Sequence, residues 1–345
     1  MTRGSATRRF RTIDAHAAGE PLRLIVEGYP APKGRTMNEK RAWLKRYADS
    51  IRRVLMLEPR GHADMYGAVL TEPVSAEADA GVLFMHNAGY STMCGHGIVA
   101  VTTIALERGL IHPRQKHCVV YDSPAGVVRA RAHVRAREGT GERGDAMRVE
   151  RVAFDNVPSF VLAPGLPIHV GRREIRVDVA FGGAFYAIVD AEAAGLPIVP
   201  GRLPDLRRVG MEIKHAVEAA LTVVHPLDKE LKGIYGTIFT GPAEREDADL
   251  RNVTVFADAE VDRSPCGTGT CAVMAVLDAM GLLPPERPFG HESIIGTLFT
   301  GRIAGRTRVG DYDAILPELD GSAWITGEHT FLVDDEDPLK SGFRL

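Results

Sequence analysis

Two cysteines occur in matching stretches, one in each half of the chain. Cys94–Val101 and Cys266–Val273 both fit the pattern C-G-x-G-x-x-A-V. Stretches rich in Ala, Val, Leu and Met continue from these patterns, at 98–107 and 270–282. A stretch that is apolar nearly all round predicts a buried helix. Each cysteine would then lie at the N-terminus of a buried helix.

A thiol in that position is suited to acid–base chemistry. Unpaired backbone N–H groups and a partial positive charge are found at a helix N-terminus. Both stabilise a thiolate, so we expect the pKa of each thiol to fall toward neutrality. The neighbouring glycines let a ligand approach the backbone, whose free N–H groups suit a carboxylate.

Two such thiols, related by pseudo-symmetry, would face each other across the interface between the halves. One of them, as the thiolate, could remove a proton from one face of a stereocentre. The other, as the thiol, would return a proton to the opposite face, and the roles would exchange with the handedness of the substrate.

The repeated motif is also compatible with other kinds of site. Its glycines match the G-x-G-x-x-A of dinucleotide-binding loops, but that function leaves the preceding cysteines unexplained, and Pro265 disfavours a central strand running into the turn. A zinc site from Cys94, His96 and distant thiols would lack any CxxC pair or HExxH motif. A phosphate-binding P-loop is excluded because no G-K-[ST] follows.

The elements around the motifs also indicate a duplicated chain. Residues 18–26 resemble residues 182–189, and apolar residues at helical spacing predict an amphipathic helix at 38–56 and another at 203–223. Short β-rich runs lie at 81–85, 127–129, 175–179 and 253–256. The predicted fold class is α/β (α+β), with two pseudo-symmetric halves that each wrap a β-sheet around a central helix.

The polar segment 136–146, rich in helix and strand breakers, marks the predicted boundary between the halves. We expect a first half at 1–150, joined by the C-terminal segment 326–345, and a second half at 151–325. Four cysteines in 345 residues do not make a disulfide scaffold. We expect Cys118 and Cys271 to be buried, inert thiols.

Composition excludes several other classes of function. The net charge is −3, with basic and acidic residues well mixed, and aromatic residues make up 6% of the chain. Neither a nucleic-acid partner nor a membrane surface is indicated. Residues 1–11 lack the apolar core of a signal peptide, so we expect a disordered tip on a cytoplasmic protein, with the first strand beginning near Ile13.

The sequence resembles the proline racemase family, which shares its fold with diaminopimelate epimerase. The resemblance covers nearly the whole chain. It is carried by Ile13–His16 with Gly19–Pro21, by Leu57–His62, by Met93–Gly97, by Asp262–Thr270 and by the terminal Asp335–Leu339.

This resemblance implies a role for each residue of the motifs. Cys94 and Cys266 would be the acid/base pair, and His96 and Asp262 would bond with the ring nitrogen of the substrate. The carboxylate would be held by the backbone around Gly95, Gly97, Gly267 and Thr268. Neither pyridoxal phosphate nor a metal is implied, and a homodimer is common in the family.

The family contains proline racemases, 4-hydroxyproline 2-epimerases and trans-3-hydroxy-L-proline dehydratases. The dehydratases commonly carry Thr in place of the second cysteine, so Cys266 favours a racemase or an epimerase. Phe256 occupies a position at which the racemases have an aromatic residue in the wall of the substrate pocket. Tyr66 replaces a common Phe and could bond with a substrate hydroxyl, while the segment from His86 to Tyr90 is closer to the dehydratase branch.

The sequence therefore favours inversion at Cα, with proline as the first candidate substrate and 4-hydroxyproline as the second. Dehydration of trans-3-hydroxy-L-proline to Δ1-pyrroline-2-carboxylate is the rival reaction. A non-catalytic proline-binding module is the third hypothesis, but binding alone would not need a second thiol.

Overall fold

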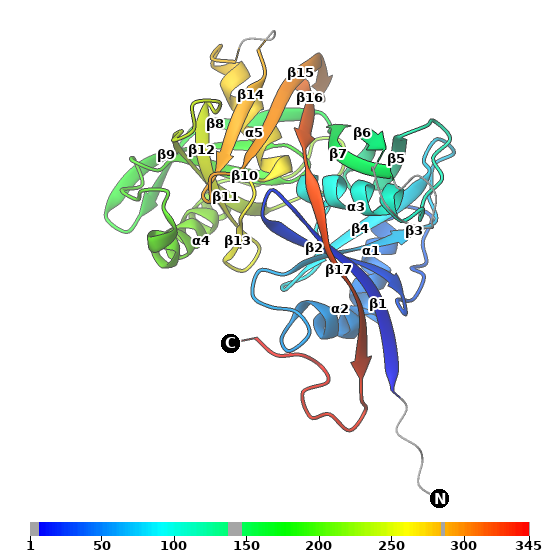
Figure 1. Cartoon of the computed structure of the whole chain (residues 1–345). Helices are drawn as coiled ribbons and strands as arrows, with labels where there is room; N and C mark the ends of the chain where they lie inside the picture. The colour runs from blue at the N-terminus through cyan, green and yellow to red at the C-terminus, as the bar shows by residue number, and fades with distance from the viewer. Residues whose placement is uncertain (1–6, 137–146, 284–286, 345) are drawn as a thin grey trace, which may run out of the picture.

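A computed structural model describes residues 7–136, 147–283 and 287–344 of the chain. The strands and helices form two halves that lie side by side (Figure 1). Each half wraps its sheet around one buried helix, α3 (Gly95–Glu107) in the first half and α5 (Gly267–Ala279) in the second. The predicted fold class, with a central helix in each half, is confirmed.

The first half contains the elements up to β7 and the last strand. These are β1 (Arg8–Ala17), β2 (Glu20–Glu27), α1 (Met37–Tyr47), α2 (Asp49–Met56), β3 (Tyr66–Thr71), β4 (Ala80–His86), α3, β5 (Cys118–Ser123), β6 (Gly126–Ala136), β7 (Met147–Asp155) and β17 (Ala323–Val333).

The second half contains the elements between them. These are β8 (Ser159–Val170), β9 (Arg173–Phe181), β10 (Phe185–Asp190), the 3₁₀ turn η1 (Pro200–Arg202), α4 (Leu203–Ala220), β11 (Ile234–Pro242), β12 (Leu250–Phe256), β13 (Glu260–Asp262), α5, β14 (Phe289–Ser293), β15 (Leu298–Val309) and β16 (Tyr312–Gly321).

The two halves repeat the same strand pairing. In the first, β2 pairs in parallel with β3, β3 is antiparallel to β4, and β4 is parallel to β5. In the second, β10 pairs in parallel with β11, β11 is antiparallel to β12, and β12 is parallel to β14. Helices α3 and α5 occupy equivalent places in this order, so the repeated sequence motif has a structural counterpart.

The chain passes from the first half to the second after β7 and returns to the first half in β17. β17 is antiparallel to β1 along its length, which is why the end of the chain returns to the first half (Figure 1). β7 pairs with both β6 and β16 and spans position 150. The domain limits 1–150 and 151–325 stay a prediction, and the pairing of β17 with β1 supports the inclusion of 326–345 in the first half.

Burial explains why the two central helices have no polar face. Every residue of α3 from Gly95 to Leu106 is buried, and α5 is buried from Gly267 to Val276. A helix surrounded by sheet gains stability from apolar side chains on all sides. Cys118 and Cys271 are buried within β5 and α5, and all four cysteines are free, as expected.

Two local predictions are wrong. The predicted helix 38–56 is divided at Ala48, whose φ of −129° and ψ of 7° are not helical, into α1 and α2. Residues 8–11 are not part of a disordered tip, because they pair with β17 and extend β1. Residues 1–6 and most of the predicted boundary segment, 137–146, lie outside the described residues.

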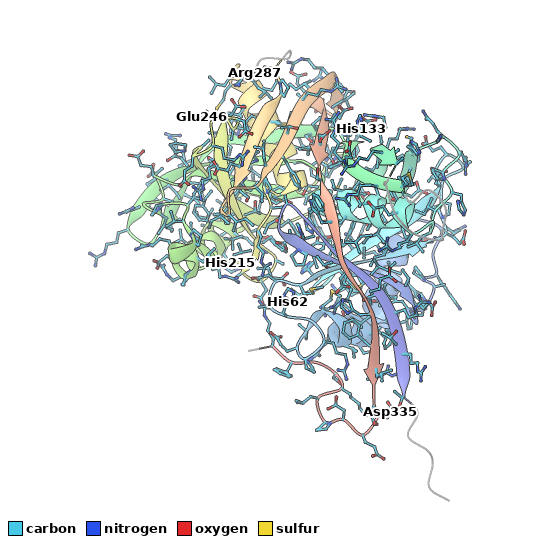
Figure 2. The ribbon with its side chains drawn as sticks, in the orientation of Figure 1. His62, His133, His215, Glu246, Arg287 and Asp335 are labelled. Atoms are coloured by element: carbon cyan, nitrogen blue, oxygen red, sulfur yellow. The ribbon has the colours of Figure 1, made fainter. Side chains whose placement is uncertain are left out.

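Charged side chains are spread over the surface of both halves (Figure 2). The acidic segment around Asp335 forms an exposed turn at the C-terminal end, where the backbone N–H of Glu336 donates to the carboxylate of Asp334 at 2.9 Å. His62 is exposed as well. No described helix is long and apolar enough to cross a membrane.

Candidate active site

The N-termini of the two central helices touch each other. A Cβ added to Gly95 would lie 2.5 Å from the Cα of Gly267, and a Cβ added to Gly267 would lie 2.5 Å from the Cα of Gly95. No side chain fits in that space, so the first glycine of each motif permits the contact. This contact brings Cys94 and Cys266 to the walls of one pocket.

The second glycine of each motif makes room for the sulfur. A Cβ at Gly97 would lie 2.9 Å from the Sγ of Cys94, and a Cβ at Gly269 would lie 2.9 Å from the Sγ of Cys266. Each thiol can therefore lie over the first turn of its helix. The two glycines of C-G-x-G thus have separate structural purposes.

The two thiols differ in local backbone and hydrogen bonding. Cys94 has an extended conformation, and its Sγ accepts the backbone N–H of Gly97 at 3.2 Å. Cys266 has a φ of 64°, in a region that a residue with a side chain rarely adopts. Its Sγ donates to the hydroxyl of Tyr186 at 3.7 Å, and its N–H donates to the Oγ of Ser264 at 3.2 Å. Such strain is commonly found at functional sites.

The pocket between the halves contains most of the residues that the sequence singled out. The space that it encloses is about 10 Å³, which is roughly the room one water molecule needs. Its lining residues are Tyr66, Met93, Cys94, Gly95, His96, Tyr186, Tyr235, Phe256, Asp262, Cys266, Gly267 and Thr268.

His96 and Asp262 face each other near the thiols. The Nδ1 of His96 lies 3.9 Å from a carboxylate oxygen of Asp262 and 3.3 Å from the Sγ of Cys94. The Oδ1 of Asp262 accepts the N–H of Ser264 at 2.8 Å and its hydroxyl at 2.7 Å. Burial lowers the pKa of His96 to about 3 and raises the pKa of Asp262 to about 6. His96 is therefore neutral at pH 7, while Asp262 is mostly ionised.

The expectation of low thiol pKa values is wrong. Burial raises the pKa of Cys266 to about 12 and raises the pKa of Cys94 well above its usual value. The N–H of Gly97 acts in the opposite direction on Cys94, but loss of hydration is the larger effect. Both thiols are therefore protonated at neutral pH in the closed pocket.

Three tyrosine hydroxyls complete the polar part of the pocket. The hydroxyls of Tyr66 and Tyr235 lie 3.1 Å apart, and that of Tyr66 donates to the Oγ of Ser91 at 2.6 Å. The hydroxyl of Tyr186 bonds with the Oγ1 of Thr268 at 2.6 Å. Burial raises the pKa of all three phenols, so they are neutral hydrogen-bonding groups.

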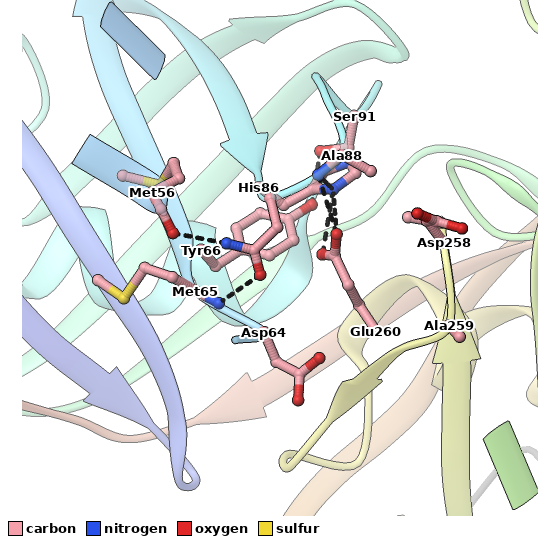
Figure 3. A network of polar contacts seen from close by, with 12 residues as sticks. Met56, Asp64, Met65, Tyr66, His86, Ala88, Ser91, Asp258, Ala259 and Glu260 are labelled. Carbon is pink, nitrogen blue, oxygen red and sulfur yellow. Dashed lines mark hydrogen bonds and ion pairs between the residues drawn. The ribbon is translucent and has the colours of Figure 1, made fainter. Parts of the chain in front are cut away.

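Two predicted site residues do not line this pocket. Gly97 lies beneath Cys94 and supplies the N–H described above. His86 stacks behind Tyr66, with ring centroids 5.6 Å apart, and bonds with Glu260 of the other half. Figure 3 shows Glu260 reaching from β13 toward His86 and the backbone N–H of Ala88, which donates to it at 2.9 Å.

Tyr186 and Tyr235 were not identified as site residues from the sequence, although a repeated sequence pattern could have revealed Tyr235. Tyr66–Thr71 and Tyr235–Thr240 both fit Y-G-x-x-x-T, and these stretches form equivalent strands, β3 and β11. The repeat places one tyrosine from each half at the seam, the interface between the two halves. Tyr186, in β10, has no comparable signal.

No group of three side chains that could hold a metal ion is present among the residues that the structure describes. The pocket contains thiols, an imidazole, a carboxylate, hydroxyls and the backbone N–H groups of two helices.

Comparison with known proteins decides the family. The family model for proline racemase matches residues 12–344. The chain belongs to the proline racemase family. It is 49% identical to a trans-3-hydroxy-L-proline dehydratase of Bacillus thuringiensis, over 97% of this chain and 98% of that protein. It is 40% identical to a proline racemase of Clostridioides difficile, over 98% of this chain and 99% of that protein.

Solved structures agree with this family membership. A hydroxyproline epimerase from Agrobacterium vitis, with bound trans-4-hydroxy-L-proline, is 33% identical and has a TM-score of 0.88, over 98% of this chain and 95% of that chain. A PhzF-family phenazine biosynthesis protein of Bacillus anthracis, 13% identical, has a TM-score of 0.54 and shares the fold. This member of the proline racemase family thus has relatives with three different named activities.

Proposed function

We propose that Cys94 and Cys266 are the acid/base pair of a racemase or 2-epimerase that inverts Cα of proline or hydroxyproline. One observation carries this proposal. Two buried thiols from equivalent positions in the two halves line a single small pocket. Inversion by a two-base route uses one proton acceptor and one proton donor on opposite faces of the reacting carbon, and a pseudo-symmetric pair of thiols supplies both.

The proposed reaction moves two protons. The thiolate of one cysteine removes the Cα proton and becomes a thiol, while the other thiol gives its proton to the opposite face and becomes the thiolate. The N-termini of α3 and α5, at Gly95, Gly97, Gly267 and Thr268, would hold the carboxylate and stabilise charge that moves onto it. His96 and Asp262 would accept the two N–H bonds of the ring ammonium.

The ring ammonium of the substrate would also offset the effect of burial on the pKa of the thiols. A positive charge beside a buried thiol stabilises its thiolate and lowers its pKa. The ammonium of the entering substrate would therefore favour ionisation of one thiol, whose proton passes to solvent.

Dehydration of trans-3-hydroxy-L-proline is the second candidate, and the 49% identity to a protein named for that reaction favours it. One thiolate would take the Cα proton, and the C3–O bond would break as a proton from the second acid releases water. The enamine product would tautomerise to Δ1-pyrroline-2-carboxylate. Both reactions begin with the same removal of the Cα proton.

Product analysis distinguishes the candidates. The purified protein is incubated separately with L-proline, trans-4-hydroxy-L-proline and trans-3-hydroxy-L-proline, and the products are followed by proton NMR and chiral chromatography. The proposal predicts the opposite Cα configuration from at least one of the first two compounds. Formation of Δ1-pyrroline-2-carboxylate from the third compound alone would identify a dehydratase, and no change in any would contradict both.

Three predictions about the whole protein stay proposals. The expected partner is a small molecule, proline or hydroxyproline, which fits the bound trans-4-hydroxy-L-proline of the 33% identical epimerase. The homodimer and the cytoplasmic location rest on the family resemblance and on the sequence.

A further inference from the structure

Tyr66 and Tyr235 are equivalent residues of the two halves. Each begins a Y-G-x-x-x-T stretch at the start of a strand that pairs in parallel with its neighbour, β3 with β2 and β11 with β10. Their hydroxyl oxygens lie 3.1 Å apart across the seam, and both side chains line the pocket that contains the thiols. The duplication thus brings together a pair of phenols as well as a pair of thiols.

The hydrogen bonds of this pair leave one acceptor free. The proton of Tyr66 goes to the Oγ of Ser91 at 2.6 Å, so the proton in the bond between the phenols comes from Tyr235. With the Tyr66 proton assigned to Ser91, no donor to the oxygen of Tyr235 remains among the hydrogen bonds of the described residues. A phenol oxygen can accept as well as donate. A ligand hydroxyl could therefore take the place of the Tyr66 oxygen as acceptor of the Tyr235 proton and donate its own proton to a phenol oxygen, so that one hydrogen bond is replaced by two.

Neighbouring rings fix the position of these hydroxyls. Phe256 stacks on Tyr235, with ring centroids 5.4 Å apart and planes inclined by 23°. His86 stacks on Tyr66 and bonds with the buried Glu260. Rings packed in this way have little freedom to turn, so the two hydroxyls form a preorganised polar spot in the pocket wall.

In the proposed function, the C3–C4 edge of the substrate ring lies next to the two tyrosine hydroxyls. The helix N-termini would hold the carboxylate, and His96 with Asp262 would hold the ring nitrogen. The remaining edge of the five-membered ring, C3 and C4, is then left for the walls that contain Phe256 and the two tyrosines.

We propose that the hydroxyls of Tyr66 and Tyr235 together bind a hydroxyl group on the substrate ring, and that the enzyme therefore prefers a hydroxylated proline to proline itself. This inference rests on the proposed function. The preference is limited, because the two phenols bond with each other when the ring has no hydroxyl and neither is left unpaired. One additional hydrogen bond corresponds to a preference of about five- to tenfold.

The test compares substrates within each variant. The kcat/KM values of the wild type, Tyr66→Phe and Tyr235→Phe are measured for L-proline, trans-4-hydroxy-L-proline and trans-3-hydroxy-L-proline. A compound that is not turned over is scored by its competitive inhibition constant. The quantity compared between variants is a ratio: the kcat/KM of the better hydroxylated compound divided by the kcat/KM of L-proline. Phenylalanine retains the ring and its stacking, so the ratio reports the hydroxyl.

Tyr121→Phe is the matched control. Tyr121 is fully buried in β5, and its hydroxyl accepts a bond from Thr102 at 3.2 Å outside the pocket. We expect a wild-type ratio above one that falls about five- to tenfold in Tyr235→Phe and in Tyr66→Phe, and that stays unchanged in Tyr121→Phe.

The outcomes separate this inference from the proposed function. If the wild type acts on at least one compound and the ratio is unchanged in both pocket variants, the role of the tyrosines is wrong and the proposed function stands. If the ratio falls equally in Tyr121→Phe, the effect is structural and the role is also wrong. If the wild type acts on none of the three compounds, the proposed function itself fails.

Discussion

At each thiol, two opposing effects act on the pKa. The N-terminus of a central helix favours the thiolate, while burial favours the thiol. Burial is the larger effect at both residues and raises the pKa of Cys266 to about 12. The same burial raises the pKa of Asp262 to about 6. These two shifts determine how activity depends on pH.

Activity is expected to rise with pH in two stages. Asp262 must be ionised to accept a bond from the ring ammonium, so kcat/KM should increase as the pH passes about 6. It should continue to rise at alkaline pH, because the fraction of thiolate in the free enzyme increases toward the pKa of Cys266. A pH profile of kcat/KM checks this. An unaltered inflection near pH 6 in Asp262→Asn would show that another group titrates there.

Replacing one thiol should separate inversion from proton removal. We expect Cys266→Ser to lose Cα inversion by about 10²–10⁴-fold, because a serine hydroxyl is a far weaker acid than a thiol and is ionised to the base far less readily. Cys94 should still exchange the Cα proton of one enantiomer with solvent. Cys118→Ala, which changes a buried thiol in β5 outside the pocket, is the control. Full inversion activity in Cys266→Ser would contradict the two-thiol mechanism.

At the scale of the elements, the contact between α3 and α5 sets the distance between the thiols. The helices approach through Gly95 and Gly267, whose backbones leave no space for a Cβ. An added methyl group in a close-packed contact forces the backbone to move. The thiols at the same helix ends would move with it, and acid–base catalysis depends on their position to within about an ångström.

Gly95→Ala should therefore reduce both stability and activity. We expect a loss of about 1–3 kcal/mol in the free energy of unfolding and a fall of about 10²-fold in kcat/KM. Chemical denaturation and initial rates measure the two effects. Gly201→Ala is the control, since a Cβ at Gly201 meets nothing within 4 Å. Equal behaviour of the two variants would show that the close approach is unimportant.

The sequence predicted the elements that carry local signals. The C-G-x-G repeat located α3, α5 and both thiols, because a helix N-terminus and its glycines are adjacent in the chain. It could not reveal that burial would outweigh the helix ends, since burial depends on the packing of both halves. Glu260 and Tyr186 were missed for the same reason: their partners, Ala88 and Thr268, are distant in sequence.

At the scale of the molecule, polar contacts close the seam around the pocket. Glu260 bonds with Ala88 and His86 (Figure 3), and the Oγ1 of Thr92 donates to the carbonyl of Gly183 at 2.8 Å. The enclosed space of about 10 Å³ is too small for a proline ring, so substrate binding requires the walls to move. Tyr235 lines both this space and a cleft of about 670 Å³ between the halves.

Removal of Glu260 should destabilise the whole protein. Its side chain is fully buried, and Glu260→Ala would leave the N–H of Ala88 and the ring of His86 without their acceptor. We expect a loss of about 3–5 kcal/mol in the free energy of unfolding, measured by guanidinium denaturation. Glu246→Ala, at the exposed position labelled in Figure 2, is the control. A loss in Glu260→Ala no larger than that of the control would contradict a stabilising role at the seam.

The central claim is that two thiols act on opposite faces of Cα, and the position of deuterium after reaction in D2O tests it most directly. The wild-type enzyme is incubated with one enantiomer of its substrate, and early samples are separated by chiral chromatography and analysed by mass spectrometry. The two-thiol mechanism predicts a product that carries one solvent deuterium at Cα, while the remaining substrate keeps its proton. Deuterium in the remaining substrate at the same rate, or a product that retains the original proton, would mean that a single base acts on both faces.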